Sequence, residues 1–167
     1  MSNRKVYISG EIVPEADAKI SIFDSAVLLG DTVTESTRTF NYKPFKLDDH
    51  LERLYKSFKL TRIDPQMTIE EMKKVSLDLL EINKDQYKGN EDCWLVHNIS
   101  RGHSITGGNP ALQVSKPTVM IYTQPMNLVL WAPFYTKGCH AVTPPTRMVP
   151  SQSLDARIKN RSRLFYT

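Results

Sequence analysis

Positively charged side chains gather in one short tract near the C-terminal end of this sequence. Residues 147–163 carry five Lys or Arg and a single acid, Asp155, a balance of +4 that equals the formal net charge of the whole chain. The five cations are Arg147, Arg157, Lys159, Arg161 and Arg163. Guanidinium and ammonium groups at this density favour an anionic partner, either a phosphate-bearing ligand or a nucleic acid. A solvated basic helix face is the structural alternative.

The other residue types that could do chemistry form no recognised pattern. The histidines at positions 50, 97, 103 and 140 do not stand at metal-ligand spacings from cysteines or carboxylates, so we expect no metal site. The sequence contains neither the phosphate-loop motif G-x-x-x-x-G-K-[ST] nor the G-x-S-x-G turn of serine hydrolases. Any chemistry must therefore come from the cations and from the elements that position them.

Composition is typical of a globular protein. The chain has 167 residues, 40% of them hydrophobic and 24% charged, which is enough to form a full-sized core. No apolar run approaches the roughly 18 to 20 residues of a membrane span, and residues 1–8 lack the core of a signal peptide. Cys93 and Cys139 form no C-x-x-C motif, as is usual for reduced thiols. We therefore expect a soluble cytoplasmic protein with no membrane partner.

The first half of the chain predicts strands followed by two helices. Alternating and β-branched residues predict strands at 5–9, 11–13 and 32–40, and residues 44–46 can pair back after a turn. Apolar residues then recur at the helical spacing from Leu51 to Phe58, with Asp48 as the expected N-cap. Thr68 and Glu71 fit a capping box for a second helix that ends before Gly89.

The second half predicts more strands and a final helix. Four β-like runs, at 93–100, 118–123, 128–131 and 140–143, are separated by turns that contain Gly or Pro. The segment from Leu154 onwards is typical of the start of a helix. Strands, two helices and further strands, without regular alternation, predict an α+β domain with a largely antiparallel sheet.

Several segments, in the same order and spacing, resemble the N-terminal domain of the class IV (fold type IV) pyridoxal-phosphate aminotransferases. That family includes the branched-chain, D-amino-acid and (R)-amine transaminases and the aminodeoxychorismate lyases. The resemblance covers essentially the whole chain. It rests on YISGEIV (7–13), ADAKI (16–20), LGD (29–31), ESTR (35–38), PFKLDDHLERL (44–54), SRG (100–102), RIK (157–159) and RL (163–164).

The resemblance implies pyridoxal 5′-phosphate as cofactor and assigns two residues to it. Lys159 matches the lysine that binds the cofactor covalently and moves a proton during the reaction. Such a lysine works with a neutral amine, a form that burial beside other cations favours. Arg53 matches the arginine that binds the cofactor phosphate. The alternatives are a solvated lysine, and an arginine that only pairs with Asp49 on the helix surface.

The resemblance also places the strand at 32–40 and the Arg101 element beside the substrate. Thr34, Arg38 and Arg101 are the residues expected to bind it. Glu35 and Arg38 are separated by an odd number of residues, so they must lie on opposite faces of the strand, and only one of them can face the pocket. Leu29 and Thr34 replace the tyrosine and phenylalanine common in branched-chain enzymes, which leaves the amino donor open.

Members of this family are roughly twice as long as this chain. The resemblance therefore implies that residues 1–125 form the small N-terminal domain and that residues 126–167 begin the large cofactor-binding domain. It further implies a homodimer that transfers an amino group between an amino acid or amine and a 2-oxo acid, with no nucleic acid as partner. An aminodeoxychorismate lyase-like enzyme, a basic module that binds nucleic acid, and a non-catalytic relic of the fold are the alternatives.

Overall fold

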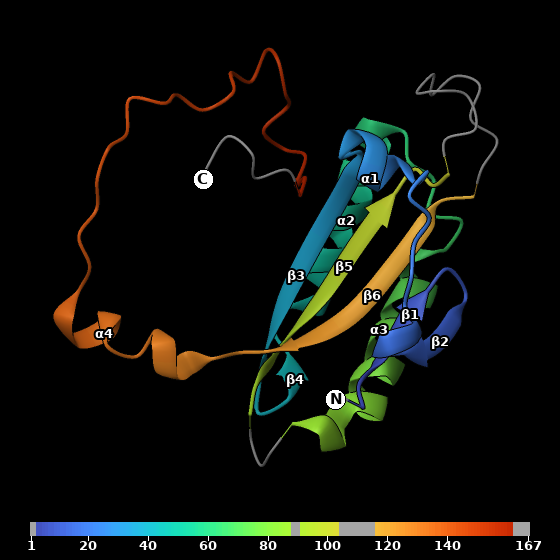
Figure 1. Cartoon of the computed structure of the whole chain (residues 1–167), viewed down its shortest axis with the longest axis horizontal. Helices are drawn as coiled ribbons and strands as arrows, with labels where there is room; N and C mark the ends of the chain where they lie inside the picture. Colours follow the sequence, from blue (N-terminus) through green and yellow to red (C-terminus); the bar gives the residue numbers. More distant parts are fainter. Residues whose placement is uncertain (1–2, 88–90, 104–115, 162–167) are drawn as a thin grey trace.

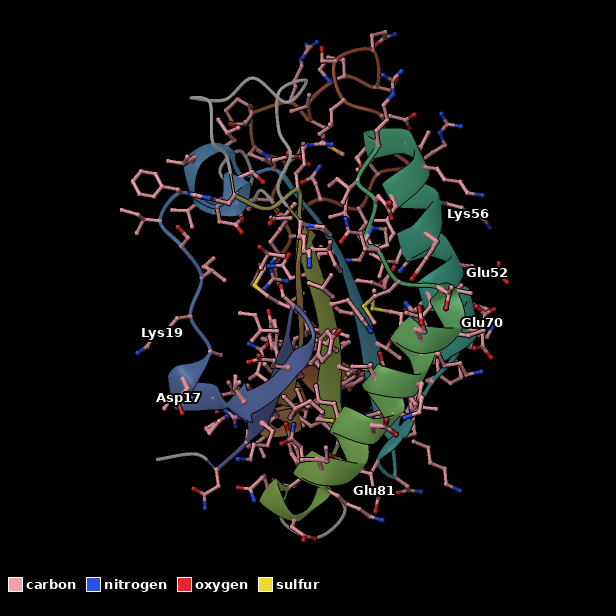
Figure 2. The ribbon with its side chains drawn as sticks, turned by 90° about the vertical axis from the view of Figure 1, so that its right-hand side faces the viewer. Asp17, Lys19, Glu52, Lys56, Glu70 and Glu81 are labelled. Atoms are coloured by element: carbon pink, nitrogen blue, oxygen red, sulfur yellow. The ribbon has the colours of Figure 1, made fainter. Side chains whose placement is uncertain are left out.

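A six-stranded antiparallel sheet forms the centre of the computed structural model, which describes residues 3–87, 91–103 and 116–161. Its strand order is β2-β1-β6-β5-β3-β4, and each neighbouring pair is antiparallel. Helices α2 and α3 cover one face of the sheet (Figures 1 and 2). The predicted α+β class is confirmed. The strands are β1 (Lys5–Ile8), β2 (Glu11–Pro14), β3 (Thr32–Phe40), β4 (Lys43–Pro44), β5 (Cys93–Ser100) and β6 (Thr118–Pro125).

The two long helices are α2 (Leu47–Thr61) and α3 (Ile69–Asn83). The capping box predicted for α3 is present, because the Thr68 side chain accepts from the Glu71 N–H while the Glu71 carboxylate accepts from the Thr68 N–H. The N-cap predicted for α2 is wrong. Lys46, in the left-handed conformation, takes that place because β4 ends only two residues earlier, and Leu47 is already helical and buried.

The shorter helices lie in the connections. The helix α1 (Ser25–Leu29), which the sequence analysis did not predict, begins where the Asp24 side chain accepts from the Ala26 N–H and ends at Gly30, whose φ is 66°. No helix in the described part of the chain is long and apolar enough to cross a membrane. The remaining short helices within the described residues are the 3-10 turns η1 (Glu15–Asp17), η2 (Lys84–Gln86) and η4 (Leu128–Leu130), and α4 (Phe134–Lys137).

The hydrophobic core lies between the sheet and the two long helices. Successive strand residues point to opposite faces, and the odd-numbered residues of the central strands face the helices. Val33, Ile99 and Val119 stand opposite one another across β3, β5 and β6 and are buried in one cluster with Leu51 and Leu54 of α2. This arrangement fixes which β3 side chains reach α2 and which lie on the other face.

The C-terminal segment leaves the sheet after β6 and returns to it (Figure 1). It passes through η4 and α4, runs without further helix or strand through residues 139–159, and forms an antiparallel bridge between Asn160 and Val33 of β3. The strands predicted at 128–131 and 140–143 are therefore wrong. No neighbouring strand pairs with either run within the described residues, and apolar residues such as Val129 stay exposed.

The helix predicted from Leu154 is also absent from residues 154–161. The Asp155 carboxylate accepts a hydrogen bond from the Arg157 N–H, and the Ile158 N–H donates to the Asp155 carbonyl. Aspartate side chains compete with helical hydrogen bonds in this way. The chain therefore forms a turn before it reaches β3, and the rest of the predicted helix lies outside the described residues.

Candidate active site

The backbone around Lys159 is held by β3 and by α2. Its carbonyl accepts a hydrogen bond from the Thr34 N–H at 2.8 Å. Its own N–H donates to the Ser57 hydroxyl of α2 at 3.4 Å. The preceding residue, Ile158, packs against the hydrophobic core, and Asn160 forms the bridge to Val33. The open edge of β3, which β4 covers only at Thr39 and Phe40, thus receives the predicted cofactor lysine.

Arg53 lies on α2, one turn before Ser57, and pairs with a buried acid. Its Nε and Nη2 donate to the two carboxylate oxygens of Glu35 at 2.7 Å and 2.8 Å. The Glu35 side chain is 0% exposed, whereas that of Arg53 is 53% exposed. Asp49, the partner that the surface alternative requires, pairs with Lys46 instead at 3.2 Å. The guanidinium of Arg53 is therefore held by the Glu35 carboxylate on the helix-facing side of the sheet.

Glu35 remains ionised although it is buried. Burial alone would raise the pKa of its carboxyl, but hydrogen bonds from Arg53, from the Ser36 N–H and from His50 together hold that pKa below its usual value. Glu35 in turn raises the pKa of the Arg53 guanidinium. Glu35 faces the helices and Arg38 faces the other side of the sheet, as their odd separation predicted.

A hollow of about 600 Å³ opens beside Arg53. It is lined by Arg53, Lys56, Lys59 and Leu60 of α2 and by Arg157 of the C-terminal segment. Lys56 pairs with Glu52 at 3.6 Å. Figure 2 shows both side chains on the outer side of α2. Four cationic side chains around one hollow, close to a lysine whose backbone is fixed, suit a small ligand that carries a phosphate. The residues present therefore fit pyridoxal 5′-phosphate.

Of the three residues expected to bind substrate, only Thr34 lies next to Lys159. Arg38 lies four residues further along β3 than Thr34, where its guanidinium stacks on Phe40 at 3.7 Å and lies 3.8 Å from Asp92. Thr34 is adjacent to Lys159 through its backbone, but its hydroxyl donates to the His97 carbonyl at 2.9 Å.

Arg101 has partners of its own at the end of α2. Its guanidinium donates to the Asp31 carboxylate at 2.7 Å and 3.3 Å and to the carbonyls of Thr61 and Arg62 at 3.0 Å each. Four of its five N–H groups are therefore used within the domain. This arrangement ties the end of α2 to the start of β3.

Sequence reasoning missed three residues that shape the site. Glu35 holds the side chain of Arg53, and Ser57 holds the backbone of Lys159, which are the two residues assigned to the cofactor. Asp155 holds the side chain of Arg157, a cation of the C-terminal tract. An acid within a β-branched strand was a signal for the first, because a buried carboxylate requires a cationic partner. Nothing in the local sequence distinguishes Ser57 from any other helical serine.

Comparisons with known proteins place this arrangement among aminotransferases. Residues 32–167 match the family model described as amino-transferase class IV. A protein assigned as a branched-chain-amino-acid aminotransferase in Methanocaldococcus jannaschii is 34% identical over 156 residues, which are 93% of this chain and 51% of that protein. A D-alanine aminotransferase of Staphylococcus epidermidis is 31% identical over 120 residues, which are 72% of this chain and 41% of that enzyme.

Solved structures show the same fold. A branched-chain aminotransferase from Thermoproteus uzoniensis with norvaline superposes with a TM-score of 0.74 at 25% identity, over 94% of this chain and 51% of that one. The fold also matches that of a T.th. branched-chain enzyme complexed with N-(5′-phosphopyridoxyl)-L-glutamate, with a TM-score of 0.78 at 22% identity, over 95% of this chain and 50% of that one. This chain thus spans about half the length of these relatives.

Proposed function

Because this chain belongs to the class IV aminotransferase family, we propose that it is part of a pyridoxal-phosphate-dependent enzyme that transfers an amino group between an amino acid or amine and a 2-oxo acid. One observation carries the proposal. The Ser57 hydroxyl accepts from the Lys159 N–H and donates to the Arg53 carbonyl at 3.1 Å, so the two residues assigned to the cofactor are linked through one side chain.

Pyridoxal phosphate, when bound, supplies an electron sink for the carbon that bears the amino group. The Lys159 amine would attach the cofactor and carry the proton between substrate and cofactor. The backbone of Lys159 is held by Thr34 and Ser57. This anchoring would limit how far the amine can move as it carries the proton between substrate and cofactor.

Arg53 would bind the phosphate of the cofactor. Its Nε and Nη2 are occupied by Glu35, so the guanidinium presents its Nη1 edge to the ligand in an orientation fixed by the buried carboxylate. Two of the cations that line the hollow, Arg53 and Arg157, already have carboxylate partners. They line one hollow together with Lys56 and Lys59, and this grouping around a single hollow favours a small phosphorylated ligand over nucleic acid.

The proposal also covers the domain boundaries, the oligomeric state, the cellular location and the substrate-binding residues. We propose residues 1–125 as the small domain and residues 126–167 as the start of the cofactor-binding domain. The enzyme would act as a homodimer in the cytoplasm. Thr34 and Arg38 would contribute to the substrate pocket from β3. For Arg101 the geometry supports a positioning role, since its hydrogen bonds to Asp31 and Thr61 tie together the elements that carry Glu35 and Arg53.

A single-turnover assay tests the proposal. The 167-residue chain and the same chain joined to the C-terminal half of a class IV relative are loaded with pyridoxal phosphate and mixed with one amino acid or amine at a time. We expect the joined protein to release the corresponding 2-oxo acid and the 167-residue chain to release negligible amounts, because the relatives are about twice as long. A joined protein that folds and binds the cofactor, yet releases neither a 2-oxo acid from any amino acid nor a ketone or aldehyde from any amine, would contradict the proposal.

A further inference from the structure

Arg157 and Arg53 are held in the same way although they come from distant parts of the chain. Glu35 binds the Nε and Nη2 edge of Arg53. Asp155 binds the same edge of Arg157, with Nε at 3.0 Å and 3.1 Å from its two oxygens and Nη2 at 2.6 Å from one of them. In both arginines the Nη1 amino group has no partner among the residues that the structure describes. Both side chains line the hollow beside α2.

The charges around the hollow suit an anion that needs more than one cation. Glu35 offsets Arg53, Asp155 offsets Arg157, and Glu52 lies near Lys56. Lys59 has no ion-pair partner within the described ranges. A phosphate group carries about −1.5 to −2 charges at neutral pH and three acceptor oxygens. The charge of Arg53 is offset by Glu35, and only the Nη1 edge of its guanidinium is available. Arg53 alone therefore cannot balance the charge of a phosphate or donate to all three of its oxygens.

We infer that Arg157 is a second arginine for the anion that Arg53 binds, and that the Nη1 groups of the two arginines donate together to the phosphate of the ligand. Each Nη1 group has two N–H donors, which provides four in total. The Asp155 pair favours one orientation of the Arg157 guanidinium before the ligand arrives, which lowers the entropic cost of binding. This inference rests on the proposed function for the identity of the ligand as pyridoxal phosphate. That an anion binds there rests only on the hollow and the cations that line it.

The Arg157→Ala variant of the full chain tests the inference. Arg157→Lys keeps the positive charge but lacks the paired N–H donors of the guanidinium. Arg147→Ala is the matched control, because it removes an arginine of the same tract that does not line the hollow. Dissociation constants for pyridoxal phosphate and for pyridoxal, which lacks the phosphate, are read from the visible absorbance. Borohydride trapping and peptide mapping show whether the adduct is at Lys159. Thermal melting confirms that every variant folds.

We expect Arg157→Ala to weaken binding of pyridoxal phosphate about tenfold or more, the range for charge-assisted hydrogen bonds, and to leave pyridoxal binding within about twofold. Arg157→Lys should be intermediate and Arg147→Ala should match the parent. Three results would overturn the inference: unchanged affinity in Arg157→Ala, an equal loss for the two probes, or an equal loss in Arg147→Ala.

A parent chain that forms no adduct at Lys159 would contradict the proposed function, and a titration with inorganic phosphate then decides the inference separately. Weaker phosphate binding in Arg157→Ala than in Arg147→Ala would support it. Equal binding in the two variants, or no phosphate binding by the parent, would overturn it.

Discussion

The Ser57 hydroxyl accepts a hydrogen bond from the backbone N–H of Lys159, across 102 residues of sequence. The same hydroxyl donates to the Arg53 carbonyl one helical turn earlier. Ser57 is fully buried and Lys159 is half-buried, so the link lies at the edge of the core. The position of Lys159 is thereby coupled to the helix that carries Arg53.

Replacement of Ser57 by alanine should loosen Lys159 without unfolding the domain. The Lys159 N–H loses its acceptor, at a cost of about 1 kcal/mol for one neutral hydrogen bond. We expect a lower yield of borohydride-trapped cofactor at Lys159 and a small decrease in melting temperature. Thr61→Ala is the control, because that hydroxyl donates to the Ser57 carbonyl on the same helix and lies outside the link to Lys159. Equal trapping in the two variants would show that the link does not position the lysine.

Replacement of Arg53 by alanine should destabilise the fold more than the loss of a surface arginine does. The buried Glu35 carboxylate would keep only His50 and the Ser36 N–H as partners. We expect a cost of about 2 kcal/mol, within the range for hydrogen bonds to charged groups, and not the roughly 1 kcal/mol or less of an exposed charge. Urea unfolding measures it. In the double variant with Glu35→Gln the cost should be less than the sum of the two single costs, and strict additivity would argue against the pair.

Glu35 should make the stability of the domain sensitive to acid. Its pKa is lower in the folded chain than the value of about 4.3 for an unfolded glutamate, so its contribution is present above that value and is lost as the pH falls through the folded pKa. Glu35→Gln should therefore flatten the acid limb of the curve of unfolding free energy against pH. Glu52→Gln, which alters an exposed acid of α2, should keep the limb of the parent.

His97 should produce a second loss of stability at milder acidity. Complete burial lowers its pKa to about 4, although the nearby Glu35 opposes this effect and His50 adds to it. Below the ordinary value of about 6.5 the unfolded chain takes up a proton that folded His97 does not, so stability falls between those two values by up to about 1.4 kcal/mol per pH unit. In His97→Gln this slope should be absent, and an unchanged slope would assign it to another group.

Local chemistry explains why much of the fold could be predicted from the sequence. The β-branched run of β3 and the Thr68–Glu71 capping box depend on neighbours in sequence, and both were predicted within a residue of their observed bounds. The segment from residue 126 onwards was not predicted correctly. Its hydrophobic residues have no partner strand in the described part of the chain, and the course of this proline-rich segment depends on its return to β3.

The candidate site was predictable only in part for the same reason. The family resemblance assigned Lys159 and Arg53 to the cofactor, and the structure places Arg53 on α2 and the backbone of Lys159 against the same helix. Their partners could not be predicted, since Glu35 meets Arg53 only when β3 packs under α2, and Ser57 meets Lys159 only after the chain has returned. Asp155, two residues before Arg157, is the partner that proximity in sequence could have suggested.

Covalent trapping of the cofactor tests the central claim most directly. The full chain is incubated with pyridoxal phosphate, reduced with borohydride, digested, and mapped by mass spectrometry beside a Lys159→Ala variant and a Lys59→Ala control that keeps Lys159. We predict one dominant modified peptide that contains Lys159 in the parent and in the control, and its loss in Lys159→Ala. Labelling spread evenly over many lysines, or undiminished labelling of the Lys159→Ala protein, would contradict the assignment of Lys159 to the cofactor.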